Sequence, residues 1–86
     1  MKKYEKIAER LKVLGHPDRL RIVIGLETDG CNVGKIQKGM GLAQATVSQH
    51  MSLLKRVGIV ESKRNGNEVC YKVIDEDILK FIELIK

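Results

Sequence analysis

The stretch of sequence that decides the fold runs from Met40 to Tyr71 and reads MGLAQATVSQHMSLLKRVGIVESKRNGNEVCY. Gly41 marks a turn, and residues 43–57 have the apolar spacing of a helix that ends at a second glycine. The two runs of strand-forming residues that follow are separated by Asn65-Gly66, the strongest short signal for a β-hairpin. A helix that is entered through a glycine turn and followed at once by a hairpin, the wing, predicts a winged helix-turn-helix.

Four further helices complete the expected architecture. Apolar residues at helical spacing predict them over residues 4–14, 18–26, 33–40 and 75–86. Glu27-Thr28-Asp29-Gly30 predicts a turn, and Asn32 is a suitable N-cap for the helix that follows it. The fold class is therefore mainly α with a β-hairpin (α+β): five helices plus a wing over residues 59–73. Because the chain has 86 residues and no linker or repeat, we expect residues 1–86 to form a single domain.

The helix over residues 43–57 has two chemically different sides. At about 100° per residue, Val47, Met51 and Leu54 fall on the side that packs into the protein. The opposite side carries small and amide side chains with one cation: Ala45, Ser48, Gln49, Ser52 and Arg56. An ordinary solvated face mixes Glu with Lys, whereas this surface can approach base edges closely and offer them hydrogen bonds. This helix is therefore the candidate recognition helix.

The charge of the chain is basic and unevenly distributed. Sixteen Lys and Arg against eleven Asp and Glu give a net charge of +5. Between Cys31 and Val60 there are four basic residues and no acid, whereas residues 75–86 contain four acids and two lysines. A middle third without carboxylates can approach phosphates without repulsion, so a polyanionic partner is expected on that part of the chain.

An enzyme is the weakest interpretation of so small a chain. Eighty-six residues leave no room for two domains around a closed cleft. The hydroxyl nearest to a histidine is that of Ser48, two residues from His50 on one helix, so the two side chains point to different sides. No third group is placed to orient them as a catalytic set, and no enzymatic activity is expected.

The segment over residues 75–86 is more apolar than a small domain needs. Ile78, Phe81, Ile82 and Ile85 share one helical stripe, and two leucines lie off that stripe. An apolar surface of this kind favours burial against a partner, and a second copy of the chain would supply the partner.

Three parts of the chain resemble the ArsR repressors, small dimeric bacterial and archaeal regulators of metal, arsenic and redox responses. Leu14-Gly-His-Pro-Asp-Arg-Leu-Arg-Ile22 resembles their opening, residues 40–55 resemble their helix turn and recognition helix, and residues 58–73 resemble their wing. The resemblance implies a homodimer formed through the helices over residues 4–14 and 75–86. It also implies double-stranded operator DNA as the partner, and release from that DNA when a signal is sensed.

The same resemblance implies which residues meet DNA. The positions that face the bases are Gln44, Ala45, Ser48 and Gln49. The positions near the backbone are Thr46, His50, Lys63, Arg64 and Asn67. The chain departs from the family pattern at Gln37, Ala43 and Ala45, where Ala, Ser and Ser are common, so the operator sequence is not carried over.

The signal is left open by the sequence. Metal-responding relatives carry a Cys-x-Cys pair at the start of the third helix, or His and Asp pairs on the last helix. The corresponding stretches here hold one cysteine, Cys31, and no histidine. Because Zn²⁺ takes about four ligands, we assign no metal ligands and no cofactor, and a metal or metalloid effector stays open as an alternative. His16 is interpreted as part of the helix start, and His50 as a packed or phosphate-facing residue.

Cys31 and Cys70 have two interpretations. In a winged helix, the short segment before the third helix pairs with the last wing strand, which would bring Cys31 beside residues 69–71. The preferred interpretation is two small, partly buried apolar residues without a bond between them. The alternative is a disulfide that acts as a thiol switch by twisting the wing.

The composition predicts a cytoplasmic protein. No apolar run follows the charged start of the chain, and no stretch approaches the roughly 20 apolar residues that span a bilayer, so neither a signal peptide nor a membrane anchor is expected. The leading functional hypothesis is a homodimeric, sequence-specific transcriptional repressor. The alternative is a winged-helix module for protein interaction, whose basic charge serves solubility.

Overall fold

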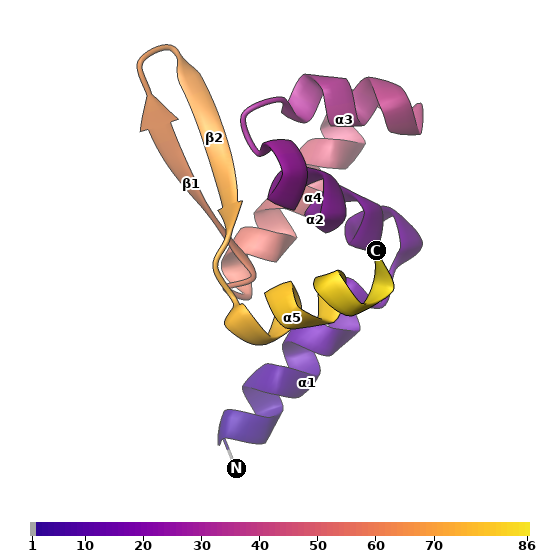
Figure 1. Cartoon of the computed structure of the whole chain (residues 1–86), viewed down its shortest axis with the longest axis vertical. Coiled ribbons are helices and arrows are strands. Elements are labelled where there is room, and N and C mark those ends of the chain that lie inside the picture. Colours follow the sequence, from indigo (N-terminus) through magenta and orange to yellow (C-terminus); the bar gives the residue numbers. More distant parts are fainter. Residues whose placement is uncertain (1) are drawn as a thin grey trace.

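The computed structural model describes residues 2–86 as five helices and a two-stranded antiparallel hairpin (Figure 1). In chain order the elements are α1 (Lys2–Leu14), α2 (Pro17–Asp29), α3 (Val33–Met40), α4 (Gln44–Arg56), β1 (Val60–Asn65), β2 (Glu68–Val73) and α5 (Glu76–Ile85). The molecule measures 40 × 26 × 24 Å, with the wing tip at one end of the long axis and the start of α1 at the other. The expected fold class, a winged helix-turn-helix, is confirmed. None of the helices within residues 2–86 combines the length and the apolar composition that crossing a membrane requires.

The core lies where α2, α4 and α5 meet the base of the wing. Its most deeply buried side chains come from all of these parts: Ile22, Val23, Leu54, Ile59, Val60 and Ile82. The sequence explains the central position of α2, because its residues from Leu20 to Leu26 are apolar on nearly every side except at Arg21. Helix α2 contacts α1, α3 and β2, so the same helix supports the recognition helix-turn-helix and the wing.

The wing is a regular antiparallel hairpin that is closed by the pair Asn65 and Glu68. This register places Gly66 and Asn67 at the two central turn positions, one residue beyond the Asn65-Gly66 pair that the sequence predicts. Gly66 has a φ of 67°, and within residues 2–86 positive φ values occur only at glycines. The turn therefore depends on one glycine at its first central position, as in a type II′ turn, and not on an Asn-Gly pair at positive φ.

Of two expectations about the connection between α2 and α3, one is wrong and the other is confirmed for the backbone position only. Helix α2 continues through Glu27, Thr28 and Asp29, where the sequence predicts a turn, and Thr28 Oγ1 donates to the carbonyl oxygen of Ile24 at 3.2 Å within its last turn. Asn32 lies at the N-cap of α3, but its side chain makes no capping bond and donates to the carboxylate of Asp29 at 2.7 Å. The side chain of an asparagine can form hydrogen bonds with groups that precede it or follow it in the chain. Here Asn32 bonds to the carboxylate of Asp29, which precedes it, and not to a backbone N–H group of α3.

Arg10 joins α1 to two other parts of the fold. Its Nε donates to the carbonyl oxygen of Val57 at 2.8 Å, and its Nη1 donates to the carboxylate of Asp75 at 2.8 Å. Asp75 is also the N-cap of α5, where it accepts hydrogen bonds from the backbone N–H groups of Asp77 and Ile78. One guanidinium and one carboxylate therefore hold α1, the end of α4 and the start of α5 together.

Candidate nucleic-acid interface

Helix α4 presents a continuous exposed side made of short polar residues. Val47, Met51 and Leu54 are buried beneath it, as the helical spacing predicts. The exposed residues, hereafter the polar face of α4, are Gln44, Ala45, Ser48, Gln49, Ser52, Lys55 and Arg56. All four residues that the resemblance places against bases belong to this face. The major groove admits an α-helix, and short hydroxyl and amide side chains can reach the edges of the bases from such a face.

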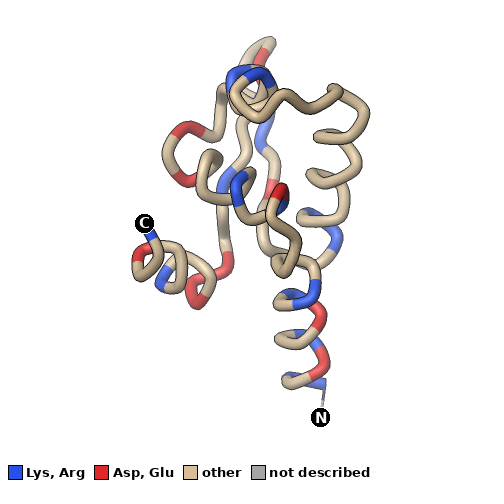
Figure 2. The backbone as a smooth tube through the Cα atoms, turned by 90° about the vertical axis from the view of Figure 1, so that its right-hand side faces the viewer, with Lys and Arg blue, Asp and Glu red and all other residues tan. Residues whose placement is uncertain are grey.

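Positive charge flanks the polar face, and no carboxylate interrupts it. From Lys35 to Arg56 the chain carries four basic residues and no acid. In Figure 2 the tube through α3 and α4 shows only blue charges, while the red ones lie on the other elements. A phosphate backbone that approaches α4 therefore meets no like charge along this helix.

The wing tip supplies the second group of candidate contacts. Lys63, Arg64 and Asn67 are all exposed there. In the hairpin register, Lys63 lies opposite Cys70 and Arg64 opposite Val69. The tip therefore presents two cations beside an exposed amide, the residue types that contact phosphates.

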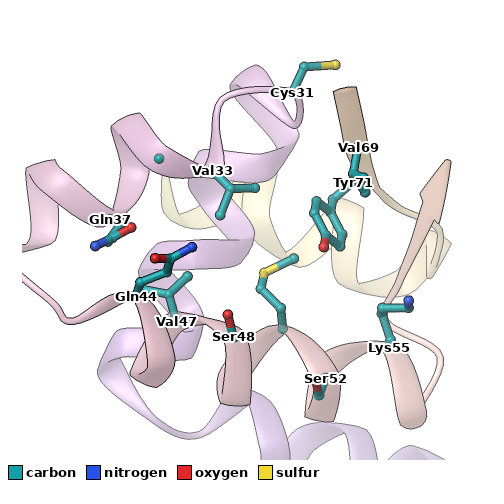
Figure 3. Close-up of a pocket in the computed structure, with 12 residues that line it drawn as sticks. Cys31, Val33, Gln37, Gln44, Val47, Ser48, Ser52, Lys55, Val69 and Tyr71 are labelled. Carbon is teal, nitrogen blue, oxygen red and sulfur yellow. The ribbon is translucent and has the colours of Figure 1, made fainter. Parts of the chain in front are cut away.

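A cleft of about 440 Å³ separates the wing from α3 and α4 (Figure 3). Helix α4 contributes Gln44, Ser48, Ser52 and Lys55 to one wall, and β2 contributes Val69 and Tyr71 to the other. Ser52 and Lys55 are absent from the contacts assigned from the sequence. Helical spacing already placed Ser52 on the outward side of this helix, and it could have found Lys55 as well, because residues four and seven positions after Ser48 lie on the same side of a helix.

The Nδ1 side of the His50 ring faces α2. It is half-buried, its ring centroid lies 5.1 Å from that of His16, and its Nδ1 accepts a hydrogen bond from Arg19 Nε at 3.2 Å. Burial lowers the pKa of His50 from its ordinary value of 6.5, as do the charges of Arg19 and His16, while Asp18 acts in the opposite direction. Because Nδ1 is an acceptor, the proton of the neutral ring resides on Nε2.

His16 is the N-cap of α2, where its Nδ1 accepts a hydrogen bond from the backbone N–H of Asp18 at 3.1 Å. This is the structural role that the sequence predicts for it. His16, Asp18 and His50 bring potential ligand atoms within 4.8 Å of one another. Both imidazoles, however, use the Nδ1 lone pair within the protein and carry hydrogen on Nε2, so neither can bind a metal ion without losing its present hydrogen bond.

Cys31 and Cys70 are joined by a disulfide across 39 positions, with Cα atoms 4.1 Å apart. The preferred interpretation, two unbonded apolar residues, is therefore wrong. The neighbouring backbone explains the approach: the N–H of Tyr71 donates to the carbonyl oxygen of Gly30 at 2.8 Å. A Cβ on Gly30 would lie 1.8 Å from the carbonyl oxygen of Tyr71, so only glycine allows the two segments to come this close. The expected pairing between the segment before α3 and the last wing strand is present.

A second exposed surface is apolar and lies on α1 and α5. The large apolar side chains exposed on these helices and at a residue between β2 and α5, hereafter the apolar face, are Tyr4, Ile7, Leu11, Ile74, Phe81, Leu84 and Ile85. A cleft of about 160 Å³ between the two helices is lined mainly by apolar residues of both. Of the exposed residues, Ile7, Leu11 and Phe81 line this cleft together. Neighbouring exposed apolar side chains of this size are typical of an interaction surface.

Comparison with known proteins agrees with this geometry. A family model described as a helix-turn-helix domain matches residues 14–63, more than half of the chain. An uncharacterized HTH-type transcriptional regulator of Methanocaldococcus jannaschii is 37% identical over 86 residues, which cover 99% of this chain and 97% of that protein.

Solved structures extend the likeness to three dimensions. The transcriptional repressor PagR of Bacillus anthracis has a TM-score of 0.85 at 33% identity, covering 98% of this chain and 97% of that one. The homodimeric winged helix-turn-helix DNA-binding domain of a possible ArsR-family regulator from Mycobacterium bovis has a TM-score of 0.82 at 28% identity, covering 95% and 76%. The resemblance inferred from three motifs thus extends over nearly the whole chain. The protein belongs to the ArsR family of winged helix-turn-helix, DNA-binding transcriptional regulators, a family of regulators and not of enzymes.

Proposed function

We propose that the chain is a homodimeric, sequence-specific repressor whose affinity for operator DNA depends on the thiol state of Cys31 and Cys70. The observation that carries DNA binding is the polar face of α4, which is exposed, free of carboxylates and separated by a cleft from a wing whose tip is basic. Helix α4 enters the major groove, and Lys63 and Arg64 reach the neighbouring backbone.

Each part of the interface has a distinct task. Gln44 and Gln49 can form paired hydrogen bonds with adenine, Ser48 can bond to either base type, and the methyl group of Ala45 can contact the methyl group of thymine. Thr46 and Asn67 bond to phosphates. The Nε2–H group of His50, which the Arg19 hydrogen bond leaves free, donates to a phosphate as well.

Dimerisation follows from the apolar face on α1 and α5. A monomer would leave this surface in water, whereas a two-fold axis through it buries the same residues of both copies. The relative from Mycobacterium bovis is described as homodimeric. Two α4 helices related by such an axis read two half-sites about 34 Å apart, one helical turn of DNA.

The disulfide connects the segment before α3 with the wing, so its state changes how firmly the wing is held beside α4. In a cytoplasmic protein, a disulfide is more often regulatory than structural. Reduction leaves the hydrogen bond between Tyr71 and Gly30 as the local link. A looser wing loses more conformational entropy when it is ordered on DNA, so the reduced protein should bind more weakly.

The first experiment tests DNA binding itself. The full chain is titrated into fluorescent duplexes selected from a random pool, at several salt concentrations. We expect the logarithm of the affinity to fall linearly with the logarithm of the salt concentration, because bound phosphates release counterions. Absence of binding at low salt would overturn the proposal in favour of a protein-interaction module.

The second experiment tests the switch. The same duplex is titrated with oxidised and with fully reduced protein, and the double variant Cys31→Ser/Cys70→Ser serves as the control. We expect binding of the reduced protein to be weaker by about 10-fold, or about 1.4 kcal/mol. The double variant should match the reduced protein with and without reductant. Equal affinities of the oxidised and reduced wild type would remove the thiol switch and leave DNA binding intact.

A further inference from the structure

The Cys31–Cys70 pair has a third potential ligand beside it. A carboxylate oxygen of Glu68 and the two Sγ atoms all lie within 4.8 Å of one another. Cys31 and Glu68 are exposed, and Cys70 is half-buried. The cluster is therefore at the surface, where a small ion in solution can reach it.

The backbone holds these three residues together without the disulfide. Glu68 and Cys70 are two positions apart on β2, so their side chains leave the same face of the strand. Cys31 follows Gly30, whose carbonyl oxygen accepts the hydrogen bond from the N–H of Tyr71. Neither the hairpin register nor this hydrogen bond involves the sulfur atoms.

We propose that, once the disulfide is reduced, Cys31, Cys70 and Glu68 bind a thiophilic divalent cation of the zinc group. Two thiolates and a carboxylate are ligands that Zn²⁺ and Cd²⁺ accept, with water at the fourth position of a tetrahedron. With Zn–S bonds of about 2.3 Å, the sulfurs stand about 3.8 Å apart. Side-chain rotation can reach this separation, because the two Cα atoms lie 4.1 Å apart.

The chemistry balances in two steps. An external dithiol delivers two electrons and two protons to the disulfide and is itself oxidised to a disulfide. The metal ion then replaces the two thiol protons, which pass to the buffer. The occupied site carries one net negative charge, and Lys63, which lies opposite Cys70 in the hairpin, offsets it.

This site uses the sulfurs of the proposed thiol switch, but it does not require DNA binding. Bound metal and disulfide exclude each other, because the metal ion binds thiolates and the oxidised pair has none. A bound ion would tie the wing to the segment before α3, as the disulfide does. The cluster of His16, Asp18 and His50 offers no comparable site, since both of its imidazoles have their Nδ1 atoms engaged.

The test is a titration of reduced, full-length protein with Cd²⁺ without oxygen, followed by the ultraviolet absorption of thiolate-to-cadmium charge transfer. We expect one Cd²⁺ per chain and release of two protons, with no such absorption in the oxidised protein. Cys31→Ser and Cys70→Ser should each lose the signal. Glu68→Gln should weaken binding by at least about 10-fold, because loss of a ligand costs at least as much as loss of a residue that supports a ligand. Glu61→Gln, an exposed change on β1, should bind like wild type.

A second readout needs no substitution. Stoichiometric Zn²⁺ should slow the air oxidation of the wild-type thiols, because coordinated thiolates are not free to form the disulfide. Binding that survives in the double cysteine variant, or an unchanged rate of oxidation with Zn²⁺, would overturn the proposal. An affinity of Glu68→Gln equal to that of Glu61→Gln would remove Glu68 from the site. None of these outcomes depends on whether the protein binds DNA.

Discussion

The polar face of α4 and the apolar face on α1 and α5 are both exposed, but they have opposite chemistry. The first consists of short polar side chains and cations, and Glu and Asp do not occur anywhere on its helix. The second consists of large apolar side chains, and Leu84 is 83% exposed. The two faces differ in the partner they can accept, since one suits a polyanion and the other suits apolar surface. A chain of 86 residues thus presents one surface suited to a polyanion and another suited to an apolar partner.

Hydrogen bonds of Arg10 connect the two faces. Arg10 lies on the helix that carries part of the apolar face, and it bonds to the carbonyl oxygen of Val57 at the end of α4. Its partner Asp75 caps α5, the other helix of the apolar face. In Figure 1, α1 and α5 lie together at one end of the molecule, while α3 and the wing lie toward the other. Arg10 and Asp75 therefore join the two helices of the apolar face to the end of α4.

The largest effect is expected from breaking the apolar face. Leu84→Asp places a charge on the most exposed of its leucines, so it should abolish dimerisation without disturbing the core. Loss of the second half-site should weaken operator binding by about 10²–10⁴-fold, the usual gain from joining two binding modules. Sedimentation and duplex titration measure the two effects. Lys80→Ala, an exposed change on the same helix, is the control, and a dimeric Leu84→Asp protein would contradict this assignment.

The next effect concerns the contact that places the wing beside the polar face. Gly30→Ala pushes a Cβ into the carbonyl oxygen of Tyr71, so we expect a loss of about 1–3 kcal/mol in the free energy of unfolding. The backbone of Gly30 is in the right-handed helical region, which an alanine can adopt. The expected loss of stability therefore comes from the clash with Tyr71 and not from backbone strain. Gly39→Ala is the control, because nothing lies near its Cβ and it should stabilise α3 by up to about 1 kcal/mol. Urea denaturation measures both, and equal stabilities would contradict the contact.

Two substitutions with effects of comparable size should distinguish base contacts made by α4 from backbone contacts made by the wing. Gln49→Ala should cost about 1–3 kcal/mol on the preferred operator and relax the preference at one base pair. Arg64→Ala should weaken binding about equally on all sequences and reduce the salt slope by about 1. Titrations on operator and scrambled duplexes at two salt concentrations measure the difference. Matching specificity losses in both variants would show that the wing also reads bases.

The smallest effect is the pH dependence that His50 contributes. Its pKa is lowered in the folded protein, so the unfolded chain binds more protons as the pH falls below 6.5. The stability that neutral His50 contributes is therefore complete above pH 6.5 and decreases as the pH falls through the folded value. His50→Gln keeps an acceptor for Arg19 and should show a flatter dependence of the unfolding free energy between pH 7 and pH 5. Identical pH profiles would contradict the lowered pKa.

The elements of the fold were largely predictable, because they depend on neighbours along the chain. The buried stripe of Val47, Met51 and Leu54 follows from helical periodicity alone, as does the exposed polar face opposite it. The predictions were wrong where a short polar side chain or a turn residue had more than one possible local arrangement. Asn32 bonds to Asp29 and leaves α3 without a side-chain cap, and the hairpin turn uses Gly66 and Asn67 instead of Asn65 and Gly66.

The details of the candidate sites were less predictable. Helical spacing places His50 off the buried side, but only packing against α2 turns its ring to Arg19 and His16. The cleft between α4 and the wing combines residues from Cys31 to Tyr71, and its shape depends on the distance between the two elements. Spacing along one element cannot predict such a distance.

The sequence by itself determined the winged helix-turn-helix, the family, and the division into polar and apolar faces. These properties follow from periodicity, glycine positions and charge, all of which act over a few residues. Only the tertiary structure decided that Cys31, Cys70 and Glu68 meet, because contact across 39 positions depends on how the wing packs against the end of α2. That packing depends on Gly30, where the absence of a side chain lets Tyr71 approach.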